Sequence, residues 1–287
     1  MSWLNRLRLH NHYLNWGAAL IAVLAVAVYY RVVGKLVVDW IHIPDFSHGP
    51  LVPPFAAYLV WVKRDTLRQT KIVPTWSGVA VVALGMVVLI LGVYGAELFL
   101  SRISLLIMLA GLILCFGGWQ LLKELRFALM VLLLAIPIPA IVFNEITLPL
   151  QFWASKAATA MLQMCDVPVL REGNVIELPL MKLEVAEACS GIHSLLSLFT
   201  LSVFYGYFLE KSVLRRILLA LASLPIAIAA NAVRIFGTGL CVQYWDPDKA
   251  MGFFHEFSGL VMFLVSLFCL YLFHRAMSLI PERKVNA

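Results

Sequence analysis

The sequence predicts an all-α integral membrane protein with about eight transmembrane helices. Apolar residues make up 62% of the 287 residues and charged residues only 13%, and the mean hydropathy is +0.90. A soluble domain averages roughly 45–50% apolar and about 25% charged residues. The apolar residues are gathered in blocks, most of them close to the roughly 17–25 residues that cross a bilayer core. Charged and turn residues separate the blocks, so we expect one polytopic membrane domain over 1–287.

The expected spans follow the apolar blocks in order. They are 16–38, 49–62, 75–94, 103–120, 127–143, 191–209, 215–235 and 257–273. The first apolar run continues from Gly17 to about Val38 without a break, which favours a retained helix over a cleaved signal peptide. The second block contains Pro50, Pro53 and Pro54, so its outer end is expected to be irregular.

The placement of the basic residues predicts the orientation. Most of the 22 Lys and Arg residues fall in alternate gaps between the blocks, together with the two termini. Because cytoplasmic loops are enriched in Lys and Arg, both termini are expected in the cytoplasm. The net charge of +6 is thus explained by topology, and nucleic acid is not an expected partner.

One long extracytoplasmic loop, 144–190, is expected between the fifth and sixth spans. Residues 148–164 have apolar positions at helical spacing and predict an amphipathic helix lying on the outer surface. The following stretch VIELPLMKLEVAEA, 175–188, alternates apolar and polar residues around a proline. This alternation predicts a short β-hairpin that leads directly into Cys189.

The orientation gathers the reactive residues at the outer ends of the spans. These are Ser47, His48, Cys189, Asn231, Arg234, His255 and Glu256. Cys189 immediately precedes an apolar helix for which Ser190 can serve as N-cap. The positive end of a helix dipole lowers a thiol pKa and favours the nucleophilic thiolate. The alternative interpretation is a small buried residue at a helix start.

Arg234 and His255 are the candidate partners of this thiol. Arg234 is expected near a helix end at membrane depth, with Asn231 on the same helical face, and its fork of donors could stabilise an oxyanion. The alternative is an arginine that reaches the interface. His255 is the best general acid/base candidate, and His48 and His193 are weaker ones.

Other chemistries lack their signatures. The sequence contains no H-x-x-x-H or C-x-x-C spacing, so no metal site is expected. It has no G-x-S-x-G elbow, P-loop or dinucleotide fingerprint either, and we expect no cofactor.

Five motifs in chain order resemble the exosortase family, the EpsH-like relatives of the archaeosortases. They are DFSHGPLVP (45–53), REGNVIELP (171–179), LEVAEACSGIHSLL (183–196), PIAIAANAVRI (225–235) and HEFSG (255–259). The resemblance implies a sorting transpeptidase of Gram-negative inner membranes, here in a single-domain form, with Cys189, Arg234 and His255 as the triad. The motif position that is commonly Arg is His193 here, which removes a second positive charge near the nucleophile.

The same resemblance implies the substrates and the reaction. Substrates would be exported proteins that end in a PEP-type motif, a transmembrane helix and a basic tail. Cys189 would attack the carbonyl, Arg234 would stabilise the oxyanion, and His255 would protonate the amine; a thioacyl intermediate would then be resolved. The partners would be these substrates and membrane lipids, and the site would face the periplasm. The alternatives are a transporter or lipid-binding protein and an exopolysaccharide assembly scaffold.

Overall fold

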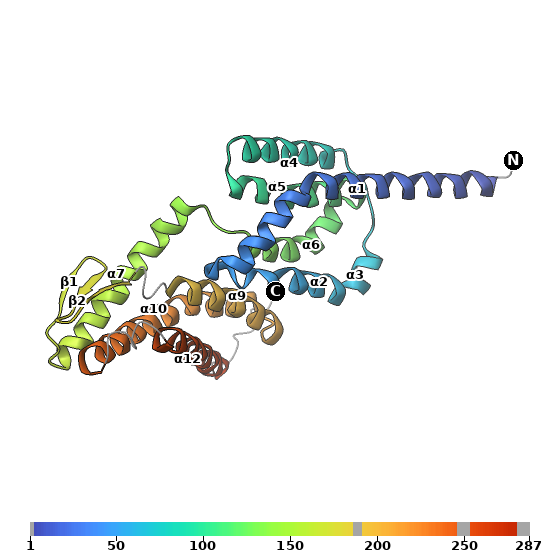
Figure 1. The fold of residues 1–287 in the computed structure, drawn as a ribbon. Helices are drawn as coiled ribbons and strands as arrows, with labels where there is room; N and C mark the ends of the chain where they lie inside the picture. The colour runs from blue at the N-terminus through green and yellow to red at the C-terminus, as the bar shows by residue number, and fades with distance from the viewer. Residues whose placement is uncertain (1–2, 186–190, 246–252, 280–287) are drawn as a thin grey trace. The chain divides into compact units, whose positions relative to one another are not determined.

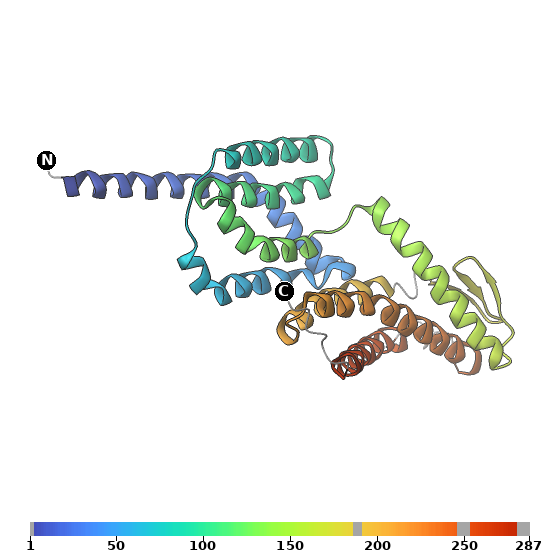
Figure 2. The same cartoon turned by 180° about the vertical axis from the view of Figure 1, so that it is seen from behind.

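The computed structural model describes residues 3–185, 191–245 and 253–279; the side chains of residues 3–16, 18, 19, 191–193 and 253–256 fall outside this description. The chain forms two compact units, each described by itself below. One unit is Met1–His42 with Gly49–Pro137, and the other is Ile43–His48 with Ile138–Ala287. Both units are predominantly helical, as Figures 1 and 2 show.

The first unit consists of helices and short 3-10 turns. Its elements are α1 (Trp3–His42), η2 (Gly49–Leu51), α2 (Val52–Val62), α3 (Arg64–Gln69), α4 (Ser77–Tyr94), α5 (Leu98–Phe116), α6 (Gly118–Leu132) and η3 (Leu133–Ala135). The irregular start expected for the second span is confirmed, because η2 precedes α2. Proline lies in the first turn of α2, where its missing N–H costs no helical hydrogen bond.

A stripe of small residues brings α4 and α5 into backbone contact. Gly78, Gly85 and Gly92 recur every seventh residue on α4, and all three are buried. A Cβ added to Gly92 would lie 2.4 Å from the backbone nitrogen of Ser101, and one added to Gly111 would lie 2.7 Å from that of Val82. Small residues permit such close packing in membrane helices, where apolar burial provides little driving force.

Polar contacts join helix ends in the first unit. The Arg102 side chain, 3% exposed, forms an ion pair with Asp39, and the Trp40 Nε1–H donates to the Ala135 carbonyl at 2.7 Å. These contacts gather the C-terminal ends of α1 and α6 and the N-terminal end of α5. Lys63, at the end of α2, pairs instead with Glu124 in the first half of α6 at 3.0 Å. The helices therefore alternate in direction, as consecutive spans require.

The second unit contains the remaining elements. They are η1 (Pro44–Phe46), α7 (Ala140–Met164), β1 (Leu170–Glu172), β2 (Val175–Glu177), β3 (Lys182–Glu184), α9 (Gly191–Leu209), α10 (Val213–Tyr244) and α12 (Phe253–Ser278). The span expected over 127–143 is interrupted, because the helical turn η3 ends at Ala135 and α7 begins at Ala140. Pro137 and Pro139 lie in this break and explain it, since proline disfavours a helical residue before it.

The described residues contain five helices long and apolar enough to cross a membrane, or six if Gly118–Ala135 and Ala140–Met164 form one interrupted span. The expectation of an all-α membrane protein is confirmed, whereas this count is lower than the eight expected spans. Part of the difference lies in α2, which has only 11 residues. α9 is apolar and 19 residues long, but its side chains are described only for Ser194–Leu209, so it is not among the five.

A three-stranded antiparallel sheet packs beside α7 (Figures 1 and 2). The expected hairpin is confirmed as β2 and β3, and β1 extends it through the turn at Gly173, whose φ is +64°. The predicted amphipathic helix is the C-terminal part of α7. Its polar Gln151 and Ser155 are buried, however, and contact the β1–β2 turn at Asn174 and Gly173.

A polar cluster joins α9, α10 and α12 at one end of the second unit. Buried Glu210 lies 2.9 Å from His274 Nε2, and His274 Nδ1 lies 2.8 Å from the Tyr205 hydroxyl. The Arg215 guanidinium lies 3.8 Å from the same carboxylate. The cluster fixes the end of α9, the start of α10 and the last turns of α12 at one level.

Candidate active site

Arg234 projects from α10 toward α12. Its Nε lies 3.4 Å from the Ser258 hydroxyl, and a Cβ added to Gly259 would lie 3.3 Å from one of its terminal nitrogens. The guanidinium therefore lies against a glycine, six residues after the start of α12 at Phe253. α10 continues to Tyr244, so Arg234 lies inside the helix, not at its end as expected from the span 215–235.

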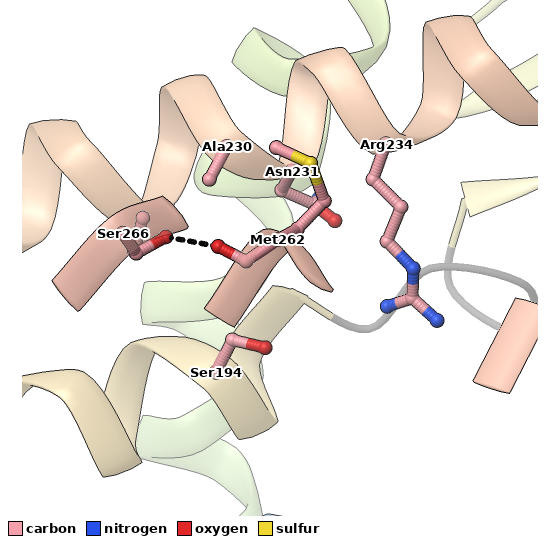
Figure 3. A pocket seen from close by; sticks show the side chains of 7 residues that line it. Ser194, Ala230, Asn231, Arg234, Met262 and Ser266 are labelled. Carbon is pink, nitrogen blue, oxygen red and sulfur yellow. Dashed lines mark hydrogen bonds between the residues drawn. The ribbon is translucent and has the colours of Figure 1, made fainter. Parts of the chain in front are cut away.

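A small cleft lies where three helices meet. It is lined by Ser194 from α9, by Ala227, Ala230, Asn231 and Arg234 from α10, and by Met262 and Ser266 from α12. In Figure 3, Arg234 lies at the end of the cleft opposite Ser266, with Asn231 and Met262 between them. The cleft is small and has room for roughly one water molecule.

Asn231 and Arg234 share one face of α10, as their spacing of three residues predicts. Asn231 is buried, with 8% of its surface exposed, whereas Arg234 is half-buried. An amide and a guanidinium on the same wall give the cleft several hydrogen-bond donors. Such a wall is suited to an oxygen that carries or develops negative charge.

The other predicted residues occupy the edges of this region or fall outside the description. Cys189 and Ser190 lie outside the described residues. His193 lies on the first turn of α9 and His255 on the first turn of α12, but their side chains also lie outside the description. His48 is buried in the second unit, whose η1 packs against α9, and it does not line the cleft formed by the described residues.

The sequence patterns singled out only Asn231 and Arg234 of the residues that line the cleft, and they also missed Ser258 and Gly259 beside the arginine. Ser194 follows His193 within the motif around Cys189, and Ser258 and Gly259 complete the motif that begins with His255. Residues three and four positions apart share a helical face. Helical spacing would therefore have grouped Ser258 and Gly259 with His255 on α12.

The arrangement places a positively charged hydrogen-bond donor, the Arg234 guanidinium, in the cleft. The described residues contain no group of three or more His, Cys, Asp or Glu side chains placed to hold a metal ion. The sequence-based expectation that no metal or cofactor takes part remains a prediction. The Arg234 fork could hold a carboxylate or a peptide oxyanion, because it presents several N–H groups in one plane.

Comparison with known proteins identifies the family. No curated protein and no solved structure shows significant similarity to the chain. The family model for transmembrane exosortases, however, matches residues 40–272, a range that includes every candidate site residue named above. The resemblance seen in the five sequence motifs is thereby confirmed, and the chain belongs to the transmembrane exosortase family.

Proposed function

We propose that this exosortase is a cysteine-dependent transpeptidase that removes a C-terminal sorting signal from exported proteins, with Cys189, Arg234 and His255 as its catalytic residues. Membership of the exosortase family supports a membrane-embedded protein-sorting transpeptidase in general. The substrate signal, the thioacyl route and the three roles belong to the proposal.

The observation that carries the proposal is the position of the Arg234 guanidinium against α12. The guanidinium contacts α12 at Ser258 and Gly259, three and four residues after His255. The same cleft is lined by Ser194, five residues after Cys189 and one turn into α9. The helices that follow the cysteine and carry the histidine therefore meet at the arginine, although the three positions are far apart in sequence.

The proposed mechanism is nucleophilic catalysis in two steps. The Cys189 thiolate attacks the scissile carbonyl, and Arg234, with support from Asn231, stabilises the oxyanion. The intermediate collapses as the C–N bond breaks and His255 gives its proton to the departing amine. A thioester remains on Cys189 while the substrate's helix is released. An amine or water then attacks the thioester and regenerates the thiol.

The proposed setting is the periplasmic face of a bacterial inner membrane, with both termini in the cytoplasm. The contacts within the second unit form two groups at different depths along its helices, which supports this orientation. Arg234 and Ser258 meet near the start of α12, and the Glu210–His274 cluster lies near its end. Arg215 and Arg216 border the second group, as expected for a cytoplasmic end. The proposed partners are exported proteins that carry the C-terminal signal.

The nucleophile test separates this enzyme from the transporter and scaffold alternatives. We expect Cys189→Ala to abolish trimming of a tailed reporter while membrane insertion and reporter binding persist, because helix docking depends on packing elsewhere. Cys189→Ser should also be nearly inactive, since a hydroxyl has a far higher pKa than a thiol. The measurement is precursor against trimmed product on a gel, in a strain without other sorting enzymes. Normal trimming by Cys189→Ala would refute the proposal and favour a scaffold.

The intermediate can be identified directly. Wild-type enzyme mixed with the reporter and quenched in acid should carry the reporter's body as a thioester on Cys189, and mass spectrometry locates the attached residue. Attachment to another residue, with normal turnover, would contradict the assignment of the nucleophile.

The Arg234→Lys variant tests the second role. A lysine keeps the charge but cannot reproduce the planar fork, so we expect the trimming rate to fall by roughly 100-fold, the scale seen when an oxyanion donor is lost. Reporter binding should change little in comparison. A variant that trims at the wild-type rate would show that charge alone, or another group, stabilises the oxyanion.

A further inference from the structure

The hydrogen-bond alternation of the sheet determines which backbone groups of β3 face outward. The Val185 N–H donates to the Asn174 carbonyl at 3.1 Å, and the Leu178 N–H donates to the Met181 carbonyl at 2.9 Å. In an antiparallel ladder, hydrogen-bonded pairs alternate with non-bonded pairs. In the register of β2 and β3, Leu183 therefore bonds with β2, whereas the N–H and C=O of Lys182 and Glu184 point away from it.

β3 is an edge strand with exposed outward-facing residues. The strand order is β1-β2-β3, and β2 is the strand that pairs with β3 in the described part of the chain. Lys182 and Glu184 are both exposed, while Leu183 between them is 2% exposed. A hydrogen bond with Glu177 raises the pKa of Lys182, which keeps its ammonium charged. Charged side chains discourage indiscriminate pairing at an edge but leave its backbone available to a specific partner.

The sheet is attached firmly to the helix that carries Arg234. Leu183 and Val185 pack in one apolar core with Ala232 and Ile235, residues that lie on either side of Arg234 in α10. α7 supplies further members of this core. Because close-packed cores hold their parts within small displacements, a chain aligned on β3 would be aligned with the guanidinium as well.

We propose that the edge of β3 binds the extended segment of the substrate before the scissile bond, as a fourth strand of the sheet. This inference rests on the proposed function. β3 ends at Glu184, five residues before Cys189 in the sequence, so a peptide paired with it lies within the short reach of chain that separates the strand from the nucleophile. The segment after the scissile bond is a helix whose backbone groups bond internally. The segment before it has free backbone donors and acceptors, which strand addition satisfies.

Matched variants at the two edges of the sheet test the role of the backbone. Glu184→Pro removes an outward N–H, whereas Glu184→Ala removes only the side chain. Arg171 on β1 also faces outward, because its partner Ile176 bonds with β3 instead. We expect Glu184→Pro to trim the tailed reporter about threefold to tenfold more slowly than Glu184→Ala, the cost of one hydrogen bond. Arg171→Pro and Arg171→Ala should trim at equal rates.

A substrate series tests the same pairing on the wild-type enzyme, without any risk to folding. Semisynthetic reporters carry a single N-methyl group at successive peptide bonds before the scissile bond. Strand pairing predicts slow trimming at every second position and normal trimming between them. With the Glu184→Pro enzyme, N-methylation at one of these positions should no longer slow the trimming.

The outcomes separate this inference from the proposed function. Trimming by Cys189→Ala would refute the function itself. An inactive Cys189→Ala together with equal rates for Glu184→Pro and Glu184→Ala, or with N-methyl effects that lack a period of two, would refute only the role of the edge. Light scattering in detergent measures whether Glu184→Pro loses a dimer. Loss of a dimer with unchanged trimming would assign the β3 edge to a second copy of the chain and would also refute substrate binding there.

Discussion

The position of the Arg234 side chain depends on the glycine at position 259, which has no side chain to displace it. The guanidinium lies over Gly259, and a Cβ there would lie 3.3 Å from a terminal nitrogen and 3.5 Å from the central carbon. The 3.3 Å contact requires the terminal nitrogen to move by a few tenths of an ångström. A glycine in the middle of a helix otherwise costs roughly 0.5–1 kcal/mol relative to alanine. The glycine is therefore explained by the arginine and not by the stability of α12.

Gly259→Ala should separate stability from activity. We expect the helix to gain about 0.5–1 kcal/mol while the trimming rate falls by up to roughly tenfold, because small misplacements of a catalytic group are costly. The measurements are the thermal midpoint in detergent and the reporter trimming rate. The matched control is Gly237→Ala on α10, where an added Cβ meets nothing within 4 Å. Equal trimming rates in the two variants would show that Gly259 does not position Arg234.

At the residue scale, the sequence predicted part of the site. Asn231 and Arg234 were expected on one helical face, and both line the cleft. Ser194 and Ser258 were missed because neither type of residue stands out until the neighbouring helices are known. The meeting of Cys189 and His255 with this cleft remains a prediction, since Cys189 and the His255 side chain lie outside the described residues.

At the element scale, the α4–α5 pair depends on its glycine stripe. Gly92→Ala would place a Cβ 2.4 Å from a backbone nitrogen of α5, and a backbone atom cannot rotate away as a side chain can. We expect the variant to lose about 1–3 kcal/mol of stability, the usual cost of overpacking. Thermal unfolding in detergent measures the loss. Gly34→Ala on α1, where an added Cβ meets nothing within 4 Å, should be at least as stable as wild type.

The elements differed in how well pattern alone predicted them. Long apolar blocks identified α1, α4, α5, α10 and α12, because a helix satisfies all of its backbone groups within the bilayer. Two prolines at 137 and 139 marked the break that the apolar run concealed. α7 was misjudged in one respect. Its polar residues Gln151 and Ser155 turn toward the sheet, a partner that helical periodicity cannot indicate.

At the scale of the whole molecule, the contacts inside each unit show separately which helix ends lie together. Within the first unit, the Asp39–Arg102 and Trp40–Ala135 contacts gather the ends expected outside, and Lys63–Glu124 joins ends expected inside. Within the second unit, the candidate site lies near the start of α12 and the Glu210–His274 cluster near its end. Which of these ends lies outside the membrane remains a prediction from the basic residues.

The membrane orientation is testable with reporters placed at both levels. A reporter fused after Lys71 or Arg216 should be cytoplasmic, because both sites follow basic segments. A reporter inserted near Gly173 should be periplasmic, since the β1–β2 turn follows the outer end of the preceding spans. Paired reporters that each work on only one side of the membrane, alkaline phosphatase outside and a fluorescent protein inside, give opposite signals at each site. If the Gly173 insertion is cytoplasmic, the sheet that leads to Cys189 cannot meet exported substrates, and both the orientation and the proposed site fail.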